Sequence, residues 1–238
     1  MVGSNFSFIP KSFTFDNYWR LVTEKPIFLW LKNSLVLAIS TLVVSLGVAI
    51  PAAYAFSRYR FAGRKTILTT LILLNAFPAI LSMFAIYRLL SPLGLINSRL
   101  GLTIVYIGTM AIFALWNLKG YFDTIPLGIE EAARIDGASD FVIAKSIMLP
   151  LAKPSIIVTS VMILIYVWNE YIYAITFLTG AEKYTLAAGL YSLQATETAG
   201  NWPVFAAASL LVSLPVLVMF LLAQKHMVSG LTIGGIKE

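Results

Sequence analysis

The sequence predicts an all-α polytopic membrane protein with five transmembrane helices, and three observations support this fold class. Of the 238 residues, 59% are hydrophobic and only 12% are charged, whereas a soluble domain carries about 25% charged residues. This number of charged residues is too small to cover the surface of a water-soluble protein of this size. Most of the chain must therefore lie in lipid. The apolar residues gather in five long stretches, each close to the roughly 20 residues that span a bilayer. One polar segment, residues 119–154, separates the third stretch from the fourth.

Residues 1–32 precede the first apolar stretch and mix aromatic with charged side chains. Aromatic rings that anchor at a membrane surface while charges stay in water are typical of a short amphipathic segment. We therefore expect residues 1–32 to lie at the extracytoplasmic interface. A partly ordered tail is the alternative interpretation.

The predicted transmembrane domain covers residues 33–225, and its spans are residues 34–56, 66–89, 100–118, 155–177 and 204–223. In the first span, Gly47, Ala49 and Ala53 would let another helix approach closely. In the second, Pro78 lies near the middle and is expected to bend the helix. We interpret residues 178–203 as a polar loop and residues 226–238 as a C-terminal tail.

The loop between the first two spans sets the orientation. Arg58, Arg60, Arg64 and Lys65 lie there without an acidic residue, and such an excess of basic residues marks a cytoplasmic loop. Alternation then places residues 119–154 and the C-terminus in the cytoplasm. It also places the basic residues of 1–32 outside, where they are hard to translocate without a preceding span. We therefore expect a further span upstream of Met1.

The polar segment 119–154 begins with the signals of a short helix. Pro126 suits the first helical position, and Glu130 and Glu131 suit the positive N-terminal end. Arg134 follows Glu130 by four residues, a spacing at which ion pairs stabilise a helix. Gly137 is expected to end the helix in a left-handed conformation.

A second short helix is expected after this corner. Ser139 or Asp140 can cap it, and it should stop before Pro150. Ala132 and Ala133, on the first helix, leave one face almost without side chains. A partner protein could therefore close around the backbone there, whereas an ordinary interfacial amphipathic loop is the alternative.

Composition excludes several classes of site. The chain has no cysteine and a single histidine, His226, which excludes disulfides, thiolate metal sites and cysteine nucleophiles. An intramembrane enzyme would need a nucleophile–base or metal set that these residues do not supply. A secondary transporter would want inverted repeats and buried carboxylates, and only Glu170 offers one. The net charge of +6 comes without the aromatic-interleaved basic cluster of nucleic-acid binders.

The segment also resembles the EAA signature of ABC importer permeases, and the residues that carry this resemblance are Glu131, Ala132, Ala133, Asp136, Gly137, Ala138, Ile147, Leu149 and Pro150. Ala144 departs from the pattern, since many relatives have Phe there; Phe141, one turn earlier, can fill that space. The sequence WNEY at 168–171 is similar to maltose-type carbohydrate permeases. The C-terminal sequence also resembles the tail of these permeases, and the residues that match are Gly230, Leu231, Thr232, Gly234, Gly235 and Lys237.

The resemblance implies the type I ABC importer transmembrane fold, in the cytoplasmic (inner) membrane of a prokaryote, with six spans of which the first would precede Met1. It implies that the protein helps to move a sugar, such as a di- or oligosaccharide, across the membrane by alternating access. Transport of a non-sugar solute is the alternative. The implied partners are a second homologous permease, a dimer of cytoplasmic ATPase subunits and an extracytoplasmic sugar-binding protein. ATP and Mg would bind the ATPase, with no cofactor and no ATPase site in this chain.

The resemblance also implies roles for particular residues. Segment 119–154, with Glu130 beside the signature, would be the coupling loop that docks on the ATPase, and the tail would reach the ATPase dimer. Candidates for contact with substrate or the partner permease are Asn75, Asn117, Trp168, Asn169 and Glu170. Amides can meet sugar hydroxyls but equally make interhelical hydrogen bonds, and for Glu170 we favour a structural hydrogen bond.

Overall fold

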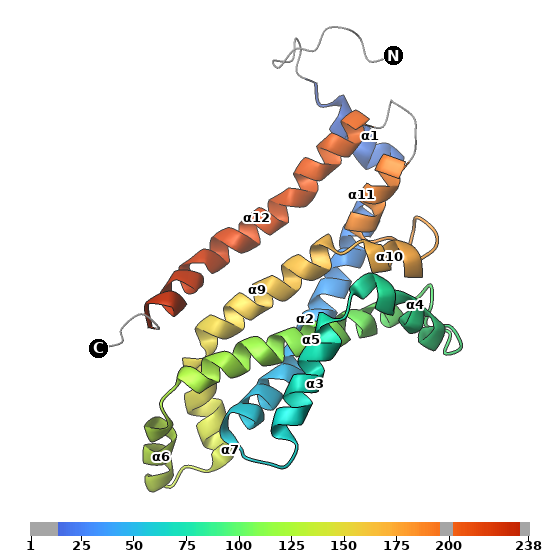
Figure 1. The fold of residues 1–238 in the computed structure, drawn as a ribbon. Coiled ribbons are helices and arrows are strands. Elements are labelled where there is room, and N and C mark those ends of the chain that lie inside the picture. The colour runs from blue at the N-terminus through green and yellow to red at the C-terminus, as the bar shows by residue number, and fades with distance from the viewer. Residues whose placement is uncertain (1–13, 196–201, 234–238) are drawn as a thin grey trace.

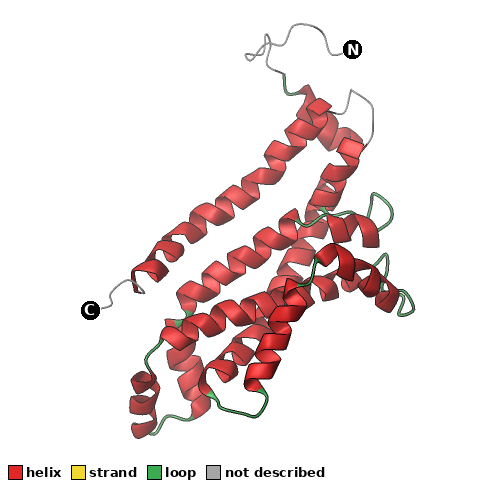
Figure 2. Ribbon diagram, in the orientation of Figure 1, coloured by secondary structure: helices red, strands yellow, loops and turns green. Residues whose placement is uncertain are grey.

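The computed structural model describes residues 14–195 and 202–233, in which every regular element is helical (Figure 2). The elements are α1 (Asp16–Glu24), α2 (Ile27–Arg58), α3 (Arg64–Ala76), α4 (Ala79–Leu90), α5 (Arg99–Thr124), α6 (Leu127–Ile135), α7 (Asp140–Val142), the π-helix η1 (Ile143–Met148), α8 (Leu149–Leu151), α9 (Lys153–Asn169), α10 (Ile172–Phe177), α11 (Leu186–Ala195) and α12 (Trp202–Ile233).

The core forms where α2, α5 and α9 pack together, with α2 against α5 as the most extensive pairing. Ala49 and Ala53 of α2 are buried, as expected for small residues that allow close helix approach, whereas Gly47 is exposed and packs against no helix of the described chain. Helix α12 packs against α9, α11 and α1. Figure 1 shows α6 and α7 at one end of the molecule and α1 and α11 at the other.

The structure contains three to five candidate membrane spans, and the predicted five are reached when each bent helix pair is counted as one span. Among the described residues, α2, α5 and the 202–224 part of α12 are long and apolar enough to cross a membrane. Two further helix pairs pass the same test together but are bent, α3 with α4 by 100° and α7–α8 with α9 by 70°. The result is three spans formed by single helices and up to five in all.

Two predicted spans are not continuous helices. The second, 66–89, breaks between α3 and α4, because Pro78 has no N–H to donate and holds Phe77 in an extended conformation. The bend expected at Pro78 is therefore a complete break. The fourth, 155–177, breaks after Asn169, where the backbone of Glu170 becomes extended.

The predicted polar loop 178–203 contains a helix, α11, which packs against α2. Asn33 of α2 donates to the carbonyls of Glu182 and Tyr184 at 3.0 and 2.9 Å, and the Ser34 hydroxyl accepts from the Leu186 N–H at 2.8 Å. This polar segment thus packs against α2, because side chains of α2 form hydrogen bonds with its backbone groups.

The amphipathic segment expected over 1–32 is shorter than predicted within the described residues. Helix α1 buries Leu21 and exposes Trp19, as an interfacial helix should, but α2 begins at Ile27. Trp30 is buried rather than interfacial, and its indole N–H donates to the Ala181 carbonyl at 2.7 Å. At the other end, α12 runs past residue 225, where the tail was expected to start, to Ile233.

Candidate functional site

The polar segment after α5 folds as the short helix α6, which ends in a tight corner. Pro126 lies immediately before the helix, one position earlier than predicted. At the other end Gly137 has a φ of +84°, and its N–H donates to the Arg134 carbonyl at 3.0 Å. The Ala138 N–H donates to the Ala133 carbonyl at 2.9 Å, which completes a Schellman motif. The predicted left-handed helix end at Gly137 is confirmed.

Glu130 anchors α6 to the end of α2. Its carboxylate pairs with the Arg58 guanidinium and accepts from the Tyr54 hydroxyl at 3.1 Å. The Glu130 and Arg58 side chains are 2% and 6% exposed, so the ion pair is buried. Such a pair needs further hydrogen bonds, and Arg58 supplies one by donating to the Ile125 carbonyl at 2.9 Å. The middle of α6 is therefore fixed to the end of the membrane-spanning helix α2.

The same cluster reaches the end of α5. The Ser57 hydroxyl accepts from Arg58 at 3.1 Å and donates to the Asp123 carboxylate at 2.6 Å. The other Asp123 oxygen accepts from Lys119 at 2.5 Å. Helices α2, α5 and α6 thus meet in one hydrogen-bonded unit.

The predicted pair between Glu130 and Arg134 is wrong. Glu130 points inward to Arg58, while the exposed Arg134 donates across the corner to Asp140 at 3.1 Å. The hydrogen bond with the Asp140 carboxylate raises the pKa of Arg134 above its ordinary value. Helix-face spacing alone missed this arrangement, because a buried partner from α2 competes successfully for the glutamate.

The helix after the corner is longer than predicted. The Ser139 hydroxyl caps it by accepting from the Val142 N–H at 3.4 Å, which agrees with one of the two expected caps. It does not stop before Pro150 but continues from Asp140 to Leu151. The widened turn of η1 precedes Pro150, and such a turn relieves the clash between a proline ring and the carbonyl four residues earlier.

Two large apolar side chains are exposed at the corner, beside the charged residues Arg134 and Asp140. Ile135, at the end of α6, is 87% exposed, and Phe141, at the start of the next helix, is 73% exposed. We call these two side chains the corner surface. It lies at the end of the molecule from which α6 and α7 project (Figure 1), and contiguous exposed apolar side chains can mark interaction sites.

The residues of the EAA-like pattern divide between exterior and interior. Those exposed are Glu131, Ala132, Asp136, Gly137 and Pro150, and those half-buried are Ala133, Ala138, Ile147 and Leu149. Of the face predicted to be bare, Ala132 is open whereas Ala133 packs against the core. Sequence reasoning missed Ile135, although an isolated apolar residue beside the glycine corner was an available signal.

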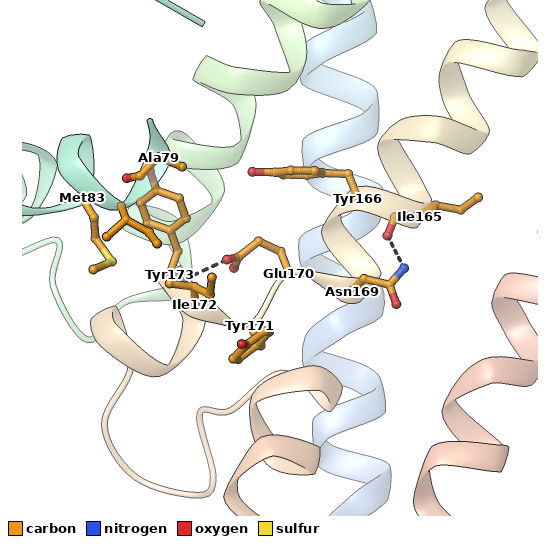
Figure 3. Close-up of a pocket in the computed structure, with 10 residues that line it drawn as sticks. Ala79, Met83, Ile165, Tyr166, Asn169, Glu170, Tyr171, Ile172 and Tyr173 are labelled. Atoms are coloured by element: carbon orange, nitrogen blue, oxygen red, sulfur yellow. Dashed lines mark hydrogen bonds between the residues drawn. The ribbon is translucent and has the colours of Figure 1, made fainter. Parts of the chain in front are cut away.

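Glu170 lies at the break between α9 and α10 and holds it in place. One carboxylate oxygen accepts from the Tyr106 hydroxyl of α5, and the other accepts from the Tyr173 N–H at 2.9 Å. The Tyr173 hydroxyl in turn donates to the Ala79 carbonyl at the break between α3 and α4, at 3.1 Å. The two broken spans are thus linked through one tyrosine, and Figure 3 shows Glu170 pointing toward it.

A pocket of about 400 Å³ opens beside this break and is lined by Ile80, Met83, Tyr166, Asn169, Tyr171 and neighbouring residues (Figure 3). A second pocket of about 340 Å³ shares Tyr166 and Tyr173 with it and includes Asn75. Volumes of this size suit a small ligand. The pockets are therefore the candidate path for a solute.

The remaining candidate contact residues have intramolecular partners. Asn117 donates to the Thr159 hydroxyl at 2.8 Å, which joins α5 to α9. The indole of Trp168 donates to the Val212 carbonyl of α12 at 3.1 Å. Asn169 donates to the Ile165 carbonyl at 2.8 Å but stays exposed, so it combines a helix-end bond with access to the pocket.

The tail residues lie at the edge of the described structure. Gly230, Leu231 and Thr232 belong to the backbone of α12, and nothing is described of their side chains. Gly234, Gly235 and Lys237 lie outside the described residues. The predicted contact of the tail with an ATPase therefore stays a prediction.

Comparison with known proteins places this geometry among transport proteins. Residues 45–226 match the family described as binding-protein-dependent transport system inner membrane component. The chain is 40% identical to the galactooligosaccharides transport system permease protein of Bacillus subtilis (strain 168), over 97% of this chain and 83% of that protein. It is 38% identical to the maltodextrin transport system permease protein of the same organism, over 95% and 81%.

A solved structure has the same fold. It is the bacterial ABC transporter involved in the import of the acidic polysaccharide alginate, which matches with a TM-score of 0.79 and 27% identity. The match covers 91% of this chain and 81% of the other. The broken and bent helices described above therefore belong to a fold that occurs in solved ABC importers.

Proposed function

This chain belongs to the family of binding-protein-dependent transport system inner membrane components, and we propose that it is the permease subunit of an ATP-driven importer for an oligosaccharide. Two relatives at 38% and 40% identity are named for maltodextrin and galactooligosaccharide transport. The alginate importer that shares the fold also handles a carbohydrate. A neutral or acidic oligosaccharide is therefore the substrate class best supported.

The corner surface is the observation that carries the coupling role. Helix α6 presents Ile135 at 87% exposure, while Glu130 on the same helix is locked to Arg58 of α2. A stiff helix transmits displacement as a rigid body. Exposed apolar side chains on a rigidly attached helix are therefore suited to pass the movement of a docked protein on to α2. We infer that segment 119–154 docks on an ATPase subunit through α6 and the corner surface.

The orientation and partners follow from this role. Segment 119–154 and the C-terminus would face the cytoplasm, in agreement with the basic residues at the end of α2, in the loop after it and at the start of α3. A second permease would complete the path, an extracytoplasmic binding protein would deliver the sugar, and ATP with Mg would bind the ATPase rather than this chain. The end of α12 would lie near the ATPase.

The state of Glu170 disfavours a secondary transporter. Ion coupling would need a carboxylate that exchanges its partner during the cycle. Both carboxylate oxygens of Glu170 are engaged, one by Tyr106 and one by the Tyr173 backbone. The residue therefore serves to hold the broken helix.

The proposal is tested by purifying the tagged full chain from native membranes in mild detergent and identifying what accompanies it. We expect a second permease and an ATPase in stoichiometric amounts, with ATPase activity that increases when the cognate binding protein and an oligosaccharide are added. A chain that purifies as a single species and transports solute on an ion gradient would contradict the proposal.

A further inference from the structure

A pocket at the same end of the molecule as α6 plays no part in the function proposed above. It lies between the start of α3 and the end of α5, and its volume is about 640 Å³. We call it the basic pocket, and the lining residues that matter here are Phe61, Arg64, Lys65, Thr69, Trp116 and Lys119.

The basic pocket carries net positive charge, although the Asp123 carboxylate interacts electrostatically with both Lys119 and Arg64. Its lining includes three cations and no carboxylate. Lys119 is paired with Asp123, but among the described residues neither Arg64 nor Lys65 has an ion-pair partner. Helix α3 also starts here with no side chain capping it, so its first N–H groups add partial positive charge.

The rest of the lining is apolar and aromatic. Phe61 and Trp116 line it, and aromatic rings are enriched at the headgroup level of a membrane. The indole N–H of Trp116 is buried and has no acceptor in the part of the chain that the structure describes. Cations beside aromatic rings at the end of membrane-spanning helices match a molecule with an anionic head and apolar chains.

We propose that the basic pocket binds the headgroup of an anionic phospholipid, with the phosphate held by Arg64 and Lys65 and the acyl chains lying along α3 and α5. Basic pockets between membrane helices bind anionic headgroups for this electrostatic reason. Lipid bound here would lie beside Asp123 and Lys119, and therefore beside the cluster that anchors α6. The proposal is independent of which solute the protein transports.

The test measures lipid selectivity of the full chain in nanodiscs, using spin-labelled phosphatidylglycerol and spin-labelled phosphatidylcholine as probes. We expect the wild-type chain to immobilise phosphatidylglycerol preferentially. Arg64→Gln should reduce this preference about fivefold, and Arg64→Gln with Lys65→Gln about 30-fold. The matched control, Lys25→Gln with Arg88→Gln, removes the same charge at the ends of α1 and α4 and should leave the preference unchanged.

A second measurement does not depend on the folding of a charge variant. A photo-crosslinking residue at Thr69, which is exposed and lines the pocket, should capture phosphatidylglycerol in preference to phosphatidylcholine. Equal capture of the two lipids would overturn the proposal, as would equal loss of preference in the control. Displacement of the lipid by inorganic phosphate at similar concentration would show a simple anion site and would also overturn it.

Discussion

Glu130 of α6 and Arg58 of α2 form a buried ion pair, 72 positions apart in the chain, that joins the projecting helix to the membrane bundle. The pair is surrounded by the Tyr54 hydroxyl and the Ile125 carbonyl, so neither charge is left without hydrogen-bond partners. Because α6 also carries the exposed Ile135, one short helix connects the corner surface to α2 through the buried contacts of Glu130 with Arg58 and Tyr54.

Removal of one member of this pair should be more harmful than removal of both. Glu130→Ala leaves the Arg58 charge buried and unpaired, which typically costs about 3–5 kcal/mol. Arg58→Met with Glu130→Leu removes both charges and should recover most of that loss. Thermal unfolding of the purified variants in detergent measures this, and a double variant no more stable than Glu130→Ala would contradict the buried-pair interpretation.

Gly137 should tolerate only residues that accept a left-handed backbone. Its φ of +84° makes Gly137→Val strained by at least about 1–2 kcal/mol, whereas Gly137→Asn should be milder. With insertion intact, we expect Gly137→Val to separate ATP hydrolysis from uptake or to prevent assembly. Gly128→Ala is the matched control, since Gly128 lies in α6 without a positive φ. Normal uptake by the valine variant would argue against the role of the corner.

Charge on the corner surface should prevent docking. Ile135→Asp or Phe141→Asp places a carboxylate where an apolar contact is proposed, and we expect at least a tenfold loss of ATPase co-purified with the chain. Leu93→Asp is the control, because Leu93 is 68% exposed in the loop after α4. Unchanged co-purification in both corner variants would place the ATPase contact elsewhere.

Glu170 should behave as a structural residue. Glu170→Ala leaves the Tyr106 hydroxyl and the Tyr173 N–H without their acceptor, at a cost of about 1–3 kcal/mol, and Tyr106→Phe should cost less. If Glu170 instead contacts the sugar, Glu170→Ala will raise the KM for uptake while thermal stability stays unchanged. We expect the opposite pattern: lower stability and fewer active molecules, with KM preserved.

The sequence predicts best where the signal is local. The left-handed end at Gly137 and the cap at Ser139 depend only on neighbouring residues, and both are found. The sequence predicts poorly where a distant partner decides. Glu130 pairs with Arg58 of α2 instead of with Arg134 on its own helix. Tyr106 and Tyr173 stabilise a break at Glu170, within a run of apolar residues whose sequence predicts one continuous span.

The basic residues at the end of α2 and the start of α3 illustrate the same limit. Charge counting assigns them one task, which is orientation. The structure separates Arg58, which is buried in the anchor of α6, from Arg64 and Lys65, which line the basic pocket. Composition cannot distinguish these roles, because they depend on the side of α2 or α3 from which each side chain leaves.

The most direct test is uptake of labelled oligosaccharide into proteoliposomes that contain this chain, its partner permease and its ATPase. With binding protein outside and ATP inside, we expect uptake of a maltodextrin or galactooligosaccharide that stops when ATP is omitted. With Ile135→Asp, uptake should stop while the chain remains inserted. Uptake that continues without ATP, or that survives Ile135→Asp at the wild-type rate, would contradict coupling through α6.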